Sequence, residues 1–251
     1  MNSWSFSYVT DGFSESIPII MESGATKKIV ELLSSSLAVQ FPALRTVGNL
    51  LTGSAEQTQI LISYGVLNQL TKLLDSPKKT LRKEVVWSIS NITAGTEEQI
   101  QAVIDANLFP KLMEIISSQS EVVLKREALW ACANALERGT SNQIRYLIDF
   151  GIIVLFCDAL TSSDQKTVHV VLEGLAAVLT EAEKDNSWFD KIVEIIQGCG
   201  GESKLQLLLG HSDKEIIDTA RRVLDFIEID LSETAIDIAG LVPSQFSGFQ
   251  F

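Results

Sequence analysis

Apolar side chains recur at three- and four-residue intervals along most of the chain. The pattern is clear in 60–74 (ILISYGVLNQLTKLL) and in 109–136. This spacing gathers apolar residues on one face of a helix. Strands would instead show alternating polarity in runs rich in Val, Ile and Thr, and the sequence lacks such runs. Because only five prolines interrupt the helical pattern, we predict an all-α chain.

One helical motif returns at a nearly constant spacing. Segments 42–53 (PALRTVGNLLTG), 84–95 (EVVWSISNITAG) and 127–139 (EALWACANALERG) align with an asparagine in the same place, at Asn49, Asn91 and Asn134. These asparagines are 42 and 43 residues apart. Segments 1–12 and 171–182 fit the same frame one period earlier and one period later. Five consecutive units are therefore visible.

Two further helices precede the motif helix in each unit. The second of them is predicted at 25–33, 66–74, 108–116 and 152–160. Each begins after a residue that tolerates a positive φ, namely Gly24, Gly65, Asn107 and Gly151. Glycine and asparagine suit a tight corner between helices because they adopt the left-handed conformation at little cost.

Three helices in about 42 residues is the period of armadillo- or HEAT-type units, which stack into a right-handed α-solenoid. A single unit cannot cover its own apolar stripe, so neighbouring units must pack together. We expect one solenoid over 1–230, with about five to six repeats. The first repeat is partial, and the last is an atypical capping repeat formed by 191–210 and 215–229. Residues 231–251 are expected to form a flexible tail.

Charge and composition limit the classes of partner and of protein that the chain fits. The chain has 32 acidic and 20 basic residues, a net charge of −12, so it repels polyanions and favours basic partners over nucleic acid. There is no signal-peptide pattern and no run of 18 apolar residues, so we expect neither secretion nor membrane insertion. The three cysteines, Cys132, Cys157 and Cys199, are widely spaced and form no CxxC pair, which indicates neither a disulfide framework nor a zinc site.

No constellation for catalysis or for cofactor binding stands out. The sequence has no phosphate-binding glycine loop, HExxH or GxSxG motif. His169 and His211 lie far from the cysteines in the sequence. GCGGES (198–203) is read as a helix end followed by a turn. We therefore predict a binding protein that has no enzymatic activity, no metal and no cofactor.

The repeated element with recognisable chemistry is Glu-x-x-Trp-x-x-x-Asn. It occurs as Glu84/Trp87/Asn91 and as Glu127/Trp130/Asn134. Spacings of three and four place each triplet on one helix face. Val85, Ile89 and Ile92 occupy another face and are expected in the core. A single tryptophan in an apolar helix is usually a core residue, but Trp4, Trp87 and Trp130 share one position in the repeat. We therefore favour an exposed ladder along the concave wall.

Such a ladder suits an extended, basic peptide. Asparagine can both donate to and accept from a peptide main chain without reading its sequence. Two tryptophan rings one repeat apart form a slot for the stem and cation of a Lys or Arg, worth roughly 0.5–2 kcal/mol. Glu84 and Glu127 lie one turn before each ring and are expected to meet the charged head of that side chain.

These segments resemble the armadillo repeats of the importin-α nuclear import adaptors. TVGNLLTGSAEQTQ, SISNITAGTEEQIQ and ALWACANA are similar to central and C-terminal repeats of that family, and the similarity covers roughly 1–230. The family binds Lys/Arg-rich nuclear localisation signals in a major and a minor groove, and this chain matches the minor one. The resemblance implies a peptide site made of Trp87, Asn91, Trp130, Asn134, Asn49 with Arg45 in place of a tryptophan, Thr52, Gly53 and Thr58 at the groove end, and the flanking Ser90, Glu84 and Glu127.

The chain also departs from the family pattern. Trp4 is followed by Tyr8 rather than by asparagine, so most of the major groove is absent. No basic N-terminal segment precedes it, so importin-β is not expected to bind by the usual route. Ala55 stands where the family commonly has aspartate, and Glu173 and Ala177 end the ladder.

The acidic last quarter resembles the surface that the family uses for its nuclear export receptor. From position 181 onward there are 14 acidic and six basic residues, which accounts for −8 of the −12. A merely solvated capping surface is the alternative. The resemblance implies a protein of the cytoplasm and nucleus whose partners are basic cargo proteins. The rival hypothesis is an armadillo scaffold for other protein partners, without signal-peptide binding.

Overall fold

The computed structural model describes residues 16–118 and 121–240, and every regular element within them is an α-helix. The helices group in chain order into five units of three. They are α2 (Ser16–Glu22), α3 (Thr26–Leu32) and α4 (Leu37–Leu50); α5 (Ala55–Ser63), α6 (Val66–Leu74) and α7 (Lys79–Thr93); α8 (Glu97–Asp105), α9 (Leu108–Ser117) and α10 (Val122–Arg138); α11 (Ser141–Asp149), α12 (Ile152–Ala159) and α13 (Gln165–Ala182); α14 (Asn186–Gly198), α15 (Gly201–Leu208) and α16 (Lys214–Gly240).

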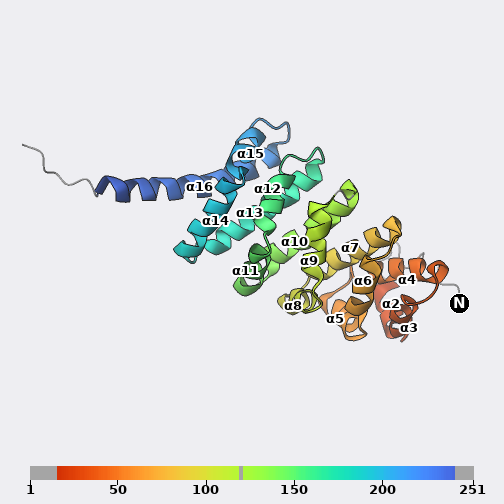
Figure 1. Ribbon diagram of the computed structural model, residues 1–251. Helices are drawn as coiled ribbons and strands as arrows, with labels where there is room; N and C mark the ends of the chain where they lie inside the picture. Colours follow the sequence, from red (N-terminus) through yellow and green to blue (C-terminus); the bar gives the residue numbers. More distant parts are fainter. Residues whose placement is uncertain (1–15, 119–120, 241–251) are drawn as a thin grey trace, which may run out of the picture.

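The units stack along one direction into an elongated array (Figure 1). The third helix of each unit packs against the third helix of the next, so that α4, α7, α10, α13 and α16 form a continuous row. This arrangement confirms the predicted α-solenoid. The partial repeat predicted at 1–12, with Trp4 and Tyr8, lies outside the described residues.

The hydrophobic core runs through the middle of the stack. Val85, Ile89 and Ile92 of α7 are completely buried, as their face of the helix predicted. The third helix of a unit is covered by its own unit and by both neighbours, which explains why its apolar face is so wide. Burial of one large aliphatic side chain contributes roughly 1.5–3 kcal/mol.

The corners between the first and second helices have the predicted backbone. Gly24, Gly65, Asn107 and Gly151 all have positive φ, with 82° at Gly65 and 54° at Asn107. A fifth corner of this kind lies at Gly200, between α14 and α15, with φ of 70°. The interpretation of GCGGES as a helix end and a turn is confirmed for residues 198–200, whereas residues 201–203 form the first turn of α15.

A glutamine holds the first helix of the third and of the fourth unit to the unit before it. Gln99 and Gln143 are the third residues of α8 and α11, and each closes a capping box with the preceding threonine. Gln99 Nε2 also donates to the carbonyl of Ala55 at 2.7 Å, and Gln143 Nε2 donates to that of Glu97 at 2.9 Å. A single side chain thus caps its own helix and fixes the register between two units.

The last unit is atypical, as predicted. Its third helix, α16, runs for 27 residues, and its C-terminal part projects beyond the stack (Figure 1). The boundary expected at 230 falls inside this helix, which continues to Gly240 because no proline or glycine interrupts residues 214–239. Residues 241–251 of the expected tail are outside the described part. Among the helices of 16–118 and 121–240, none is both long and apolar enough to cross a membrane.

Candidate functional site

The three ladder asparagines lie on neighbouring helices of the central row. Asn49 is on α4, Asn91 on α7 and Asn134 on α10. Asn91 Nδ2 donates to the carbonyl of Gly48 at 3.2 Å, and Asn134 Nδ2 donates to the carbonyl of Ser90 at 3.0 Å. The side-chain amide of each of these two asparagines therefore donates one of its two hydrogens to the preceding unit. Its second hydrogen and its Oδ1 remain to meet a ligand.

Trp87 is half-buried, and its ring lies against α4. A Cβ built on Gly48 would approach Trp87 Cζ3 to 2.3 Å, so the ring occupies the space that a side chain at 48 would need. Arg45, also on α4, places its Cζ 5.2 Å from the ring centroid. The indole is thus held between a glycine and a cation of the preceding unit.

Glu84 does not face an open groove, contrary to the sequence-based expectation. Its side chain is buried, with 8% of the residue exposed. Arg45 Nη1 donates to Glu84 Oε1 at 3.2 Å and to Oε2 at 3.1 Å. This partly buried pair fixes Arg45 over Trp87 and offsets the carboxylate charge. The arginine that replaces a ladder tryptophan is therefore bound to a glutamate of the next unit.

Trp130 is the more accessible ring of the ladder, with 40% of the residue exposed. Glu127, one turn earlier, is partly buried and lies 3.8 Å from Arg126 Nη2. Burial raises the pKa of the Glu127 carboxyl, a change that Arg126 and Lys83 oppose. Of the two predicted glutamates, Glu127 thus has the weaker internal partner and is better placed to meet a ligand cation.

A hollow of about 510 Å³ opens beside the asparagines, where α4 and α7 end. Thr52, Gly53 and Thr58 line it, as the resemblance implied for the groove end. Ser90, by contrast, is buried, and its hydroxyl donates to the carbonyl of Trp87 at 2.8 Å. It therefore stabilises the helix rather than the groove.

Two residues of the site were missed from the sequence, although both leave a signal there. A small residue directly precedes each ladder asparagine in the sequence. These residues are Gly48, Ser90 and Ala133. Arg138 lines the hollow from α10. It is visible as an extra residue, because four residues separate Asn134 from Gly139 but only three separate Asn91 from Gly95.

The ladder ends at α13, as predicted from Glu173 and Ala177. There Glu173 accepts hydrogen bonds from Arg222 Nη2 at 2.8 Å and from Thr219 Oγ1 at 3.1 Å. Burial and the neighbouring Glu173 raise the pKa of Glu137. Glu137, Glu173 and Glu181 line a second hollow of about 410 Å³. The two ends of the ladder thus differ in charge.

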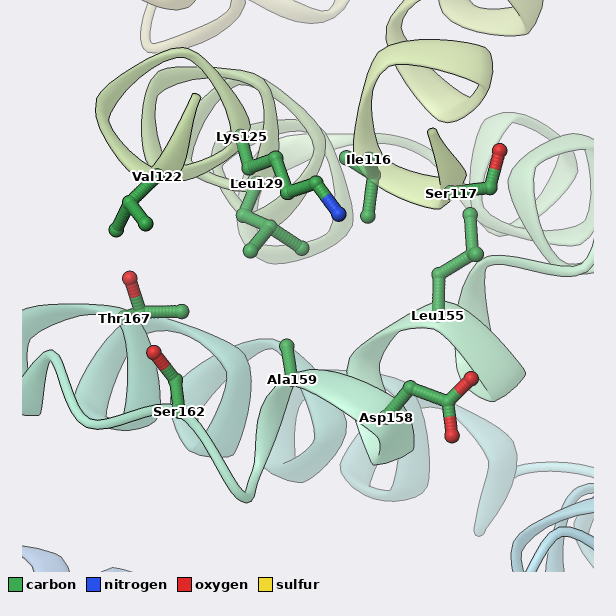
Figure 2. Close-up of a pocket in the computed structure, with 10 residues that line it drawn as sticks. All are labelled: Ile116, Ser117, Val122, Lys125, Leu129, Leu155, Asp158, Ala159, Ser162 and Thr167. Atoms are coloured by element: carbon green, nitrogen blue, oxygen red, sulfur yellow. The ribbon is translucent and has the colours of Figure 1, made fainter. Parts of the chain in front are cut away.

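A further hollow, of about 320 Å³, lies between the third and fourth units and away from the ladder. Figure 2 shows Val122, Lys125 and Leu129 of α10 on one wall, facing Ala159, Ser162 and Thr167 on the other. None of the residues predicted for the peptide site lines it.

The three cysteines form no disulfide and differ in exposure. Cys132 and Cys157 are buried, whereas Cys199 is partly exposed. Burial raises the pKa of the Cys132 thiol to about 12. Within the part of the chain that the structure describes, no three His, Cys, Asp or Glu side chains gather closely enough to hold a metal ion.

Comparison with known proteins agrees with this architecture. The family model described as Armadillo/beta-catenin-like repeat matches residues 54–94, which include the second unit. A designed armadillo repeat protein in complex with the peptide (KR)4 superposes with a TM-score of 0.79 at 29% identity, over 89% of this chain and 90% of that one.

Curated relatives define the family. Importin subunit alpha-1b of Oryza sativa subsp. japonica is 41% identical over 239 residues, which cover 93% of this chain and 45% of that protein. Importin subunit alpha-3 of Arabidopsis thaliana is 38% identical over 255 residues, covering 99% of this chain and 48% of that protein. The chain spans about half the length of these relatives. It carries an armadillo region of the importin-α family.

Proposed function

We propose that this chain is the peptide-binding armadillo portion of a nuclear import adaptor. It holds Lys- and Arg-rich nuclear localisation signals along the ladder of Trp87, Asn91, Trp130 and Asn134. The observation that carries the proposal is the alignment of α7 and α10, in which each asparagine is tied to the preceding unit. The same tryptophan and asparagine side chains therefore recur once per repeat, and such a periodic row of groups suits an extended peptide.

The contacts assign separate roles to the ladder residues. The remaining amide hydrogen and the Oδ1 of Asn91 and of Asn134 hold the peptide main chain. A Lys or Arg stem lies between the rings of Trp87 and Trp130, and Glu127 meets its cation. Arg45 closes the ladder on the Asn49 side because it already covers one face of Trp87. The net charge of −12 attracts such ligands at long range.

The proposed partners follow from the same reasoning. Basic cargo proteins bind the groove, and an export receptor contacts the acidic C-terminal region, so that the protein works in both cytoplasm and nucleus. The armadillo scaffold without signal-peptide binding is the less favoured function, because the ladder keeps its tryptophans and asparagines in register.

A binding titration tests the proposal. We would follow the fluorescence anisotropy of a labelled eight-residue peptide of alternating Lys and Arg at two salt concentrations. Trp130→Ala should weaken binding about 2- to 30-fold, from the loss of one cation–π contact and its stem packing. Because Trp130 is 40% exposed and lies outside the buried core, this variant should remain folded, as checked by thermal melting in circular dichroism.

The matched control is Leu207→Ala, which removes an exposed apolar side chain from α15, away from the ladder (76% exposed). It should bind the peptide like the unmodified protein. Equal affinity of Trp130→Ala and Leu207→Ala would refute the ladder as the binding site and would favour the scaffold function.

A further inference from the structure

The hollow at the ends of α4 and α7 has an unexpected charge. Its lining contains hydroxyl, amide and small apolar groups but no Asp or Glu, and its charged member is Arg138. Ala55 occupies the position where the resemblance would place an aspartate. The groove end that the resemblance implied for a basic peptide thus lacks a carboxylate and carries a cation.

Arg138 reaches this hollow because α10 is longer than its counterparts. The helix continues to Arg138, four residues beyond Asn134, whereas α4 and α7 end one and two residues after their asparagines. Spacings of four keep Trp130, Asn134 and Arg138 on one face. Within the described residues, the exposed guanidinium makes neither a hydrogen bond nor an ion pair. Its donors are therefore available to a ligand in the groove.

Thr58 supplies a second polar group to the same space. The residue is 3% exposed and lines the hollow. Its hydroxyl makes no hydrogen bond within residues 16–118 and 121–240. The Thr58 hydroxyl and the Arg138 guanidinium line the same hollow, and both can donate to an oxygen-rich group that enters it.

We propose that this hollow is a subsite for a carboxylate of the bound peptide, recognised by Arg138 and by the Thr58 hydroxyl. The subsite rests on the proposed function, since the ladder must first hold a peptide. It makes the groove selective for basic peptides that carry an acidic side chain, or their own C-terminal carboxylate, at the residue that enters the hollow. A lysine at that position is disfavoured by repulsion from Arg138.

The test is a coupling experiment between peptide and protein. The parent probe is the C-terminally amidated Lys/Arg octapeptide, compared with eight peptides that each carry one glutamate and with the parent ending in a free carboxylate. The proteins are the unmodified chain, Arg138→Gln, Arg138→Glu and Ala55→Asp. Lys166→Gln is the matched control, because it removes one exposed, unpaired cation at the start of α13.

For each position, the measured quantity is the affinity of the peptide with glutamate there divided by the affinity of the parent peptide. At one position, Arg138→Gln should lower this ratio about two- to fivefold, in favour of the basic residue. Arg138→Glu and Ala55→Asp should shift it in the same direction, and higher salt should shrink the effect. An effect confined to the free C-terminus would identify the terminal carboxylate as the occupant. Lys166→Gln should leave the ratio unchanged at every position.

The proposal is overturned if no position and no terminus shows a ratio that depends on Arg138, or if Lys166→Gln produces the same shift. That failure is distinct from failure of the proposed function. In the latter case the parent peptide would not bind at all, or would bind Trp130→Ala as tightly as the unmodified chain.

Discussion

Gly48→Ala tests how the ladder is assembled. The added Cβ would lie 2.3 Å from Trp87 Cζ3, 2.8 Å from Cε3 and 3.1 Å from Ser88 Oγ. Carbon atoms in contact prefer about 3.5–4.0 Å, so the indole must move by more than about 1 Å. Overpacking of this kind costs about 1–3 kcal/mol. The helix propensity of alanine returns about 0.5–1 kcal/mol.

The net expectation for Gly48→Ala is a free energy of unfolding about 0–2 kcal/mol below that of the unmodified chain. Gly198→Ala is the control, because nothing lies within 4 Å of its added Cβ and only the propensity gain applies. Relative to this control, Gly48→Ala should be less stable by about 1–3 kcal/mol.

Urea denaturation followed by circular dichroism measures the stability difference. Fluorescence anisotropy of the labelled Lys/Arg octapeptide measures the affinity of the groove for the peptide. Displacement of Trp87 should also uncouple it from Arg45 and weaken peptide binding, whereas Gly198→Ala should bind normally. If Gly48→Ala matches Gly198→Ala in both stability and affinity, the ring is not seated on Gly48 and the reasoning is wrong.

Two further predictions concern titrating groups. Burial raises the pKa of Glu127 in the folded state, so ionisation destabilises the fold as pH rises from the unfolded pKa through the folded one. In urea denaturation, the free energy of unfolding of Glu127→Gln, taken relative to that of the unmodified chain, should therefore be higher at pH 7 than at pH 4. The same variant should bind the peptide more weakly. An equal stability difference at both pH values would contradict this. With a thiol-specific disulfide reagent at pH 8, Cys199 should react first and Cys132 only after unfolding, since burial raises the Cys132 pKa to about 12; a single rate for all three thiols would refute it.

The period of the motif predicted most of the architecture because helices, caps and corners depend on local sequence. The apolar spacing located α6 at Val66–Leu74, and residues that tolerate positive φ marked Gly65 and Asn107 as corners. The C-terminal end of α16 was harder to predict than its start. Its C-terminal half carries no proline or glycine before Gly240, and its length cannot be read from the repeat.

The candidate site was predictable only in part. The sequence by itself determined which residues share a helix face, and so placed Trp87 with Asn91 and Trp130 with Asn134. It could not determine which of their atoms already make contacts within the protein. The tertiary structure decided that Arg45 binds Glu84, that Gly48 seats Trp87 and that Arg138 enters the hollow at Thr58. The physical reason is that these arrangements bring together helices about 40 to 80 residues apart, and side-chain conformation and the stacking of units set them rather than helical periodicity.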